Sequence, residues 1–305
     1  MSVKLESVTK LYGNQKALDH VSVNVKSGEI VGLLGPNGAG KSTIMKIITG
    51  YMQPDDGFVE VNGLSVKDHS LAIRKQIGYL PENNPLYTDL YVAEYLEYVA
   101  GLYHLKGIKA KVNEMIHLTG LEREQHKKIN ALSKGYRQRI GIAQALIHDP
   151  AVLILDEPTS GLDPTQIVEI RQLIRTISVN KTVILSTHIM QEVEALCDRI
   201  IIINQGQIVA ADSPANIKAF GNGETQLYVV EFLEPIKEKI LLKIPGVLES
   251  HLASGNTFIL KGGKDDLRPL IFKFAVVQKL TILTLSKQES SLEKEFMRIT
   301  NSTNN

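Results

Sequence analysis

One octapeptide combines glycines, a lysine and a serine at a spacing that suits phosphate binding. It is Gly35-Pro36-Asn37-Gly38-Ala39-Gly40-Lys41-Ser42, which fits G-x-x-x-x-G-K-[S/T] and joins an apolar stretch to a segment of helical period. Small residues let backbone N–H groups and the helix N-terminus approach a di- or triphosphate. We expect Lys41 to reach the β- and γ-phosphates, Ser42 to ligate Mg²⁺, and the binding loop to run through Thr43. A glycine-rich loop without a ligand would not explain a lysine at a helix N-terminus, where the macrodipole disfavours cations.

Two acidic residues follow a second apolar run much further along the chain. Ala151-Val152-Leu153-Ile154-Leu155 leads directly into Asp156-Glu157. A carboxylate at the carboxyl end of a core strand faces the ligand crevice of an α/β sheet, so Asp156 is placed to hold Mg²⁺ through water. Glu157 can accept a proton from, or orient, a water that attacks the γ-phosphorus. The competing interpretation, acids that cap a helix or turn, loses weight beside the phosphate loop.

A third strand-like run ends in Leu185-Ser186-Thr187-His188. Its carboxyl end should lie at the same edge of the sheet as the acid pair, because parallel strands end together. We expect His188 to donate a hydrogen bond to the γ-phosphate. A lone histidine is more often structural, but its position one strand beyond the acids favours the functional interpretation.

These residues need an α/β scaffold, and the pattern of the first 215 or so residues predicts one. Buried strands are expected at Glu29–Leu34, Val152–Leu155, Val183–Leu185 and Ile200–Ile203. Alternating segments at Val3–Val8, Val21–Val25 and Gly57–Val61 predict an antiparallel β subdomain beside this parallel core.

The strand pattern disappears between residues 85 and 147, where helical periodicity predicts an inserted helical subdomain. Tyr87, Tyr91, Tyr95 and Tyr98 recur there at helical spacing. This stripe is either an aromatic packing face inside the subdomain or a groove for a partner.

Chain breakers near Ser213-Pro214 and Gly221-Asn222-Gly223 separate residues 1–217 from a second domain, residues 222–305. Its pattern predicts strand, helix, two strands, helix and strand, the split-βαβ order of a small α+β domain. The ranges are Gln226–Glu231, Pro235–Leu242, Leu248–Ala253, Thr257–Leu260, Leu267–Phe274 and Leu280–Leu285, with a last helix near Ser291–Ile299.

Composition excludes several classes of protein. The 305 residues hold 34 Lys and Arg against 33 Asp and Glu, which does not suggest a nucleic-acid-binding surface. No apolar run approaches the roughly 20 residues of a membrane-spanning helix, and the start lacks a secretory signal. The single cysteine, Cys197, cannot form an internal disulfide and is expected to be a small buried apolar group, so a reducing cytoplasmic setting fits best.

The phosphate loop, the acid pair and His188 combine with Leu132-Ser133-Lys134-Gly135-Tyr136-Arg137-Gln138-Arg139 to give the resemblance. In this order they resemble the ATP-binding subunits of ATP-binding cassette (ABC) transporters over about residues 3–217. The resemblance implies a P-loop NTPase fold with an ABC-type nucleotide-binding domain, ATP and Mg²⁺ as cofactors, and ATP hydrolysis. The segment Leu132–Arg139 is similar to the family's signature motif, usually L-S-G-G-Q, at the start of a helix.

The resemblance also assigns roles to individual residues. Tyr12 matches the aromatic residue that stacks on adenine, although a surface-turn tyrosine is the alternative. Asp163, in Ser160-Gly161-Leu162-Asp163, matches the loop that links two active sites. In this family ATP is clamped between two copies head to tail, so the phosphate loop of one copy faces Ser133 and Gly135 of the other.

Three residues depart from the family pattern. Lys134 replaces the first signature glycine and Tyr136 the usual glutamine. Lys134 could add a positive charge near the γ-phosphate bound by the other copy or point to solvent. Glu82, in Pro81-Glu82, replaces a glutamine that senses Mg²⁺ and the attacking water. It still offers oxygen to a metal but brings negative charge toward the phosphates, so coupling at this loop is the least secure assignment.

Three features are similar to exporter subunits of the gliding-motility type and their drug-resistance and polysaccharide-export relatives. They are Leu132–Arg139 in this form, Glu82 at its loop, and the ending Ser291-Leu292-Glu293-Lys294-Glu295-Phe296. We therefore expect an ATPase that powers a separate membrane-spanning subunit from the cytoplasmic face of the membrane, contacting it through Glu82–Leu90 and the tyrosine stripe. A soluble cassette ATPase acting on ribosomes or DNA is the alternative. A third reading, a nucleotide-gated module without catalysis, conflicts with intact Lys41, Asp156, Glu157 and His188.

Overall fold

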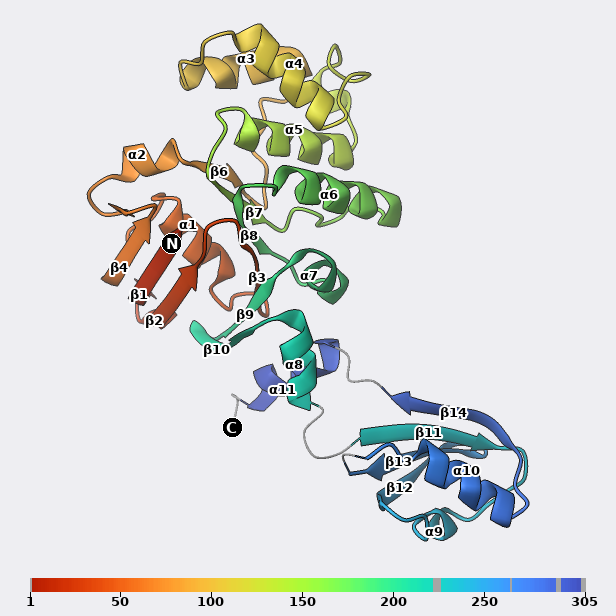
Figure 1. Cartoon of the computed structure of the whole chain (residues 1–305). Helices are drawn as coiled ribbons and strands as arrows, with labels where there is room; N and C mark the ends of the chain where they lie inside the picture. The colour runs from red at the N-terminus through yellow and green to blue at the C-terminus, as the bar shows by residue number, and fades with distance from the viewer. Residues whose placement is uncertain (1, 222–225, 264, 289–291, 303–305) are drawn as a thin grey trace. The chain divides into compact units, whose positions relative to one another are not determined.

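The computed structural model describes residues 2–221, 226–263, 265–288 and 292–302, which fall into two compact units (Figure 1). One unit comprises the residues up to Pro214 and those from Ile299 on; the other comprises residues 215–298. Asn204 Nδ2 donates a hydrogen bond to the carbonyl oxygen of Thr300, 3.0 Å away, which ties the returning chain to the first unit. The second unit thus starts before the predicted residue 222 and stops before residue 305.

A six-stranded sheet forms the centre of the first unit, in the order β10-β9-β3-β8-β7-β6. All neighbours are parallel except β10 and β9. The strands are β3 (Ile30–Leu34), β6 (Ile77–Leu80), β7 (Val152–Asp156), β8 (Thr182–Ser186), β9 (Arg199–Asn204) and β10 (Gln207–Asp212). Central strands such as β7 are buried on both faces, which explains their unbroken apolar runs. The carboxyl ends of β3, β6, β7 and β8 therefore share one edge.

Helices connect the parallel strands: α1 (Lys41–Ile48) follows β3, α6 (Pro164–Ile177) follows β7, and α7 (Met190–Leu196) follows β8. Cys197 caps the end of α7 and is buried against β3, because a Cβ at Gly32 would lie 2.8 Å from its Sγ. Strands β6 and β10 were not among the predicted strands. β6 has only four residues, and Gly78 interrupts its apolar pattern.

A second, antiparallel sheet has the order β2-β1-β4-β5. Its strands are β1 (Val3–Tyr12), β2 (Gln15–Val25), β4 (Asp56–Val61) and β5 (Leu64–Ser65), and the short helix α2 (Ser70–Arg74) leads from it to β6. One apolar core joins the two sheets, since Val8 and Val21 of this sheet cluster with Met45 of α1 and Ile154 of β7. This sheet is the predicted antiparallel β subdomain.

The helical subdomain between β6 and β7 contains α3 (Val92–Leu102), α4 (Ile108–Leu118), a 3₁₀ turn (Ile129–Ala131) and α5 (Lys134–Leu146). Helix α5 comes very close to the sheet at two glycines. A Cβ at Gly78 would collide with the carbonyl oxygen of Ala145, and a Cβ at Gly141 would collide with the side chains of Asn84 and Leu80. Small residues therefore set the distance between the helical subdomain and β6.

The second unit has its own antiparallel sheet, β12-β13-β11-β14, and its own apolar core around Tyr228, Phe232 and Phe258. Its elements are α8 (Pro214–Gly221), β11 (Gln226–Phe232), α9 (Glu238–Leu241), β12 (Val247–Ser254), β13 (Thr257–Gly262), α10 (Arg268–Val277), β14 (Ile282–Gln288) and the start of α11 (Leu292–Ser302). With β13 antiparallel to β11 and β12, this is the split-βαβ arrangement.

Helix α9 is shorter than the predicted Pro235–Leu242. The carboxylate of Glu234 instead accepts hydrogen bonds from the backbone N–H and the hydroxyl of Thr281, at 2.7 and 2.9 Å. These bonds hold the chain before α9 against the start of β14. The first residue of the predicted last helix, Ser291, lies outside the described residues.

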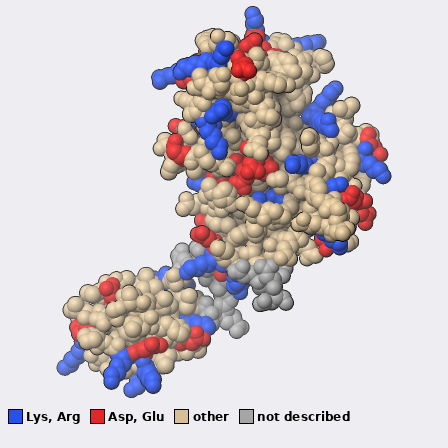
Figure 2. Space-filling model, turned by 180° about the vertical axis from the view of Figure 1, so that it is seen from behind, with Lys and Arg blue, Asp and Glu red and all other residues tan. Residues whose placement is uncertain are grey.

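Within the described part of the chain, no helix combines the length and apolar character that crossing a membrane requires. On the face drawn in Figure 2, Lys and Arg lie interspersed with Asp and Glu.

Candidate ATP-binding and hydrolysis site

The phosphate loop joins the end of β3 to the start of α1. Gly38 and Gly40 have φ values of 78° and 113°, in the left-handed region that favours glycine. A Cβ at Gly40 would lie 2.7 Å from the carbonyl oxygen of Ala17, and one at Gly35 would collide with the carbonyl of Ile203. The loop conformation therefore depends on these glycines, and it leads directly into the N-terminus of α1.

Lys41, the first residue of α1, is buried and points back over the loop. Its ammonium donates hydrogen bonds to the carbonyl oxygens of Gly35 and Pro36, at 2.7 and 3.0 Å. Burial lowers the pKa of Lys41, and the negative charges of Glu157, Asp156 and Glu82 oppose that shift. Lys41 and the three predicted acids are thus close enough for electrostatic interaction.

Asp156 and Glu157 are organised by a serine from the neighbouring strand. Asp156 pairs in register with Ser186, whose hydroxyl donates to Asp156 Oδ1 at 2.6 Å and accepts from the backbone N–H of Glu157 at 2.9 Å. Glu157 has a φ of 51°, which is uncommon outside glycine. One hydroxyl therefore fixes both acids where the chain turns out of β7.

Glu157 and His188 are in direct contact. His188 Nδ1 lies 2.8 Å from Glu157 Oε2, and the His188 side chain is 61% exposed while that of Glu157 is 11% exposed. Burial raises the pKa of Glu157, and the neighbouring charges of His188 and Lys41 oppose the rise. The structure brings together the acid and the histidine that the sequence placed on adjacent strand ends.

The oxygen donors at this edge suit Mg²⁺. Among the described residues, no three or more His, Cys, Asp or Glu side chains form a metal cage. Mg²⁺ ordinarily takes one or two carboxylates together with substrate phosphates and water, so such a cage is not needed. The Ser42 hydroxyl and the Asp156 carboxylate offer this chemistry, and Glu82 adds an exposed carboxylate beyond β6.

Tyr12 lies at the end of β1, next to the turn into β2, and is 48% exposed. Its hydroxyl is 3.2 Å from Met52 Sδ. The ring is therefore held at one end and accessible to a planar ligand.

The signature segment is packed against the Asp163 loop of the same chain. Ser133 is the N-cap of α5, and a Cβ at Gly135 would lie 2.7 Å from Gln166 Cδ. The Lys134 ammonium lies beside Gly161, although Lys134 as a whole is exposed. Asp163 caps α6 by accepting from the backbone N–H of Gln166 at 2.9 Å. Tyr136 is partly exposed on α5.

Sequence reasoning missed Ser186 and a buried group formed by Thr159, Thr187 and Glu192. The signal in the sequence that could have revealed this group is the pair of hydroxyl residues, Ser186 and Thr187, directly before His188.

The family model described as "ABC transporter" matches residues 18–160. The chain is 35% identical to the ABC transporter ATP-binding protein YhcH of Bacillus subtilis, over 99% of this chain and 96% of that protein. The chain belongs to the ABC transporter ATP-binding family.

Two named relatives and one solved structure extend this comparison. The linearmycin resistance ATP-binding protein LnrL of Bacillus subtilis is 32% identical, with 99% of each chain covered. The bacitracin transport ATP-binding protein BcrA of Bacillus licheniformis is 39% identical, with 68% of each covered. A dimeric structure of the cassette MJ0796 in a post-hydrolysis state, bound to ADP and Pi, has a TM-score of 0.65 and 31% identity, covering 69% of this chain and 98% of that one.

The predicted fold class and family are thus confirmed, and the chain is an ATP-binding, ATP-hydrolysing cassette subunit. The names of YhcH and BcrA refer to transport, so these relatives do not favour a soluble cassette acting on ribosomes or DNA. The gliding-motility subgroup stays a prediction.

Proposed function

We propose that this cassette powers a separate membrane-spanning exporter from the cytoplasmic face of the membrane, with two copies closing head to tail on two MgATP. The observation that carries the proposal is the contact of Glu157 with His188, beside the Lys41 ammonium and the Ser186-held Asp156. This arrangement has the acid, base and phosphate-binding groups that phosphoryl transfer to water requires.

Each side chain has a role in hydrolysis. Glu157 orients the attacking water and accepts its proton, and the burial that raises its pKa makes it a stronger base than an exposed carboxylate. His188 holds Glu157 in place and donates a hydrogen bond to the γ-phosphate. Ser42 and Asp156, with Glu82, would hold Mg²⁺, which when bound would supply the positive charge that neutralises the phosphates.

The second copy completes the site. Ser133 and Gly135 lie at the N-terminus of α5, where backbone N–H groups favour an anion, so they would meet the γ-phosphate of ATP bound to the other copy. Lys134 and Tyr136 flank this contact. Asp163 belongs to the loop that would couple this contact to the other active site. ATP bridges both chains only in the closed state, so binding shifts the population toward closure. The dimeric form of the related cassette MJ0796 supports this assembly.

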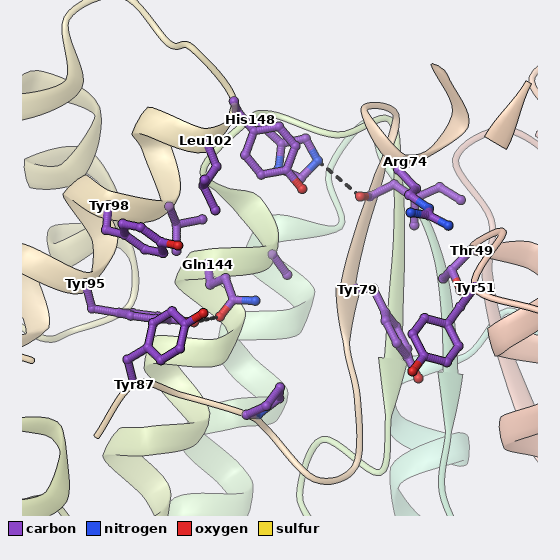
Figure 3. Close-up of a pocket in the computed structure, with 15 residues that line it drawn as sticks. Thr49, Tyr51, Arg74, Tyr79, Tyr87, Tyr95, Tyr98, Leu102, Gln144 and His148 are labelled. Carbon is purple, nitrogen blue, oxygen red and sulfur yellow. Dashed lines mark hydrogen bonds between the residues drawn. The ribbon is translucent and has the colours of Figure 1, made fainter. Parts of the chain in front are cut away.

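We propose that a segment of the membrane subunit docks in an aromatic groove of about 410 Å³ in the first unit. In Figure 3, Tyr87, Tyr95 and Tyr98 lie on one side of the groove and Tyr79 lies across from them. The Tyr87 ring meets the rings of Tyr95 and Tyr98 edge to face, with centroids 6.1 and 5.6 Å apart. Tyr95 is buried, whereas Tyr87, Tyr98 and Tyr91, which does not line the groove, are about half exposed. Both interpretations of the tyrosine stripe therefore apply: Tyr95 packs inside the subdomain, and the other three tyrosines form an accessible surface.

The segment after β6 connects this groove to the catalytic edge. The negative charge of Glu82 acts on Lys41, and Tyr87 lines the groove. Between them, Asn84 Nδ2 donates a hydrogen bond to the carbonyl oxygen of Arg137 in α5, at 2.9 Å. A segment that displaces Tyr87 would therefore move both the Glu82 loop and the signature helix. We infer the direction of transport, export, from the relatives whose names refer to bacitracin transport and linearmycin resistance.

Substitution of Glu157 by Gln tests the catalytic assignment. We expect this variant to lose turnover, keep ATP binding and accumulate as a dimer with MgATP, because the amide cannot accept the proton. Steady-state ATPase measurements and size-exclusion chromatography with light scattering provide the readouts. Glu97→Gln, at an exposed position of α3, is the matched control. Normal steady-state turnover in Glu157→Gln would remove Glu157 from its role.

Affinity capture of tagged Glu157→Gln from detergent-solubilised host membranes with MgATP tests the partner. Near-stoichiometric recovery of a multi-span protein is the expected result. Recovery of soluble or ribosomal proteins alone would contradict the transporter assignment.

A further inference from the structure

A buried carboxylate lies directly behind the Glu157–His188 contact. Glu192, on α7, is 1% exposed and belongs to none of the segments assigned a role above. Its Oε2 accepts a hydrogen bond from the Thr187 hydroxyl at 2.6 Å, and its Oε1 accepts one from the Thr159 hydroxyl at 2.5 Å. Both threonines are themselves buried. One carboxylate therefore joins the loops that follow two adjacent strands, β7 and β8.

Each threonine controls the backbone next to a site residue. Thr187 immediately precedes His188, and its hydroxyl also accepts from the backbone N–H of Ile189 at 3.0 Å, which fixes the turn that carries His188. Thr159 follows Glu157 by two positions, and its carbonyl oxygen accepts from the backbone N–H of Leu162 at 3.2 Å. Thr159 therefore holds the turn that runs from Glu157 toward Asp163.

A cation on a third element also faces Glu192. An Arg171 terminal nitrogen, Nη2, lies 3.8 Å from Glu192 Oε1, and Arg171 belongs to α6, the helix that Asp163 caps. A buried charge is costly unless it has both hydrogen-bond donors and an opposite charge, and Glu192 has both. The carboxylate thus connects the segments that carry Glu157, Asp163 and His188.

His188 needs such support, because its side chain is 61% exposed and packing holds it only in part. Glu157 is largely buried, but its left-handed backbone also has to be held in place. A catalytic group must stay within about 0.5 Å of its productive position, and supporting hydrogen bonds normally provide that precision.

We infer that Glu192 is a positioning residue, which sets the Glu157–His188 geometry for hydrolysis by holding Thr159 and Thr187 at a fixed separation. This inference rests on the catalytic roles proposed above for Glu157 and His188. Glu192 touches neither nucleotide nor water in this role. Its effect therefore falls on turnover and not on nucleotide binding, because the phosphate loop belongs to β3 and α1.

The primary test is Glu192→Gln in the full-length chain. An amide accepts through one oxygen only and carries no charge opposite Arg171, so the two threonines are no longer held symmetrically. Displacement of a reacting group by about 1 Å can cost about 100-fold in rate, and since one threonine bond survives we expect kcat to fall about tenfold. The Kd for a fluorescent ATP analogue should stay within about twofold of the unsubstituted chain. Glu194→Gln, at an exposed position of the same helix, is the control and should keep full turnover.

Thr187→Val tests the same link from the other side and preserves the side-chain shape. It should lower kcat with little change in nucleotide affinity. The double variant Thr187→Val/Glu192→Gln should be no slower than the slower single variant, because both changes break one connection. A purely structural role would instead give additive losses and weaken nucleotide binding together with turnover.

Three outcomes decide between the assignments. Unchanged kcat in both single variants, or a fall in affinity that matches the fall in kcat, would overturn the positioning role. If Glu157→Gln abolishes turnover while Glu192→Gln does not, only the positioning role fails. Normal turnover in Glu157→Gln would overturn the catalytic assignment, and the inference built on it.

Discussion

Tyr12 is the site residue that depends least on its neighbours. It stands at the end of β1 and is 48% exposed, and its hydroxyl lies 3.2 Å from Met52 Sδ. Base–aromatic stacking contributes about 1–3 kcal/mol in nucleic-acid complexes. We therefore expect Tyr12→Ala to weaken ATP affinity by about 5- to 150-fold, measured with a fluorescent ATP analogue. Tyr12→Phe keeps the ring and should bind the analogue as tightly as the unsubstituted chain does. Unchanged binding by Tyr12→Ala would contradict the stacking assignment.

Cys197 shows how burial removes the reactivity of a side chain. Its thiol is packed against β3, and burial raises its pKa to about 12. At pH 8 only about one thiol in 10⁴ is then ionised, and the thiolate is the reactive form. We expect a thiol reagent such as DTNB to label the native chain very slowly and to label the urea-unfolded chain quickly. Rapid labelling of the native protein at pH 8 would contradict the buried position.

At the scale of elements, the contact between α5 and β6 joins the signature helix to the catalytic sheet. Gly78→Ala would place a Cβ against the backbone carbonyl of Ala145, and a backbone atom cannot swing away as a side chain can. Overpacking of this kind costs about 1–3 kcal/mol, so we expect a loss of that size in the free energy of unfolding, measured with denaturant. Gly101→Ala, in α3, meets no atom within 4 Å and should be neutral or stabilise by up to about 1 kcal/mol. Equal stability of the two variants would show that α5 shifts without cost.

The elements also show what the sequence could and could not predict. Strands β3, β7, β8 and β9 were predictable because they are buried on both faces and therefore appear as continuous apolar runs. The residues at their ends were predictable for the same reason, since parallel strands end at one edge. β6 was missed, because Gly78 and its short length hide the pattern. The connection of Glu192 to Thr159 and Thr187 depends on how two loops and a helix meet in space, which no spacing in the sequence encodes.

At the scale of the whole molecule, each of the two compact units contains an apolar core among its described residues. One joins the two sheets of the first unit around Met45 and Ile154, and the other lies in the second unit around Tyr228 and Phe258. The phosphate loop, both acids and His188 all belong to the first unit. A ligand stabilises only the unit whose folded form binds it, so nucleotide should act on the two cores unequally.

Calorimetry of the full-length chain tests this division. We expect two unfolding transitions, of which a non-hydrolysable ATP analogue with Mg²⁺ raises only one. At about 100 times its Kd the ligand adds about 2.7 kcal/mol, which corresponds to a shift of about 5–10 °C for a unit of this size. The transition of the second unit should stay in place, and in Lys41→Ala, which lacks the phosphate-binding ammonium, neither transition should move. A single transition would mean that the two cores unfold as one cooperative structure, and a nucleotide-induced shift of two separate transitions would mean that the second unit also senses nucleotide.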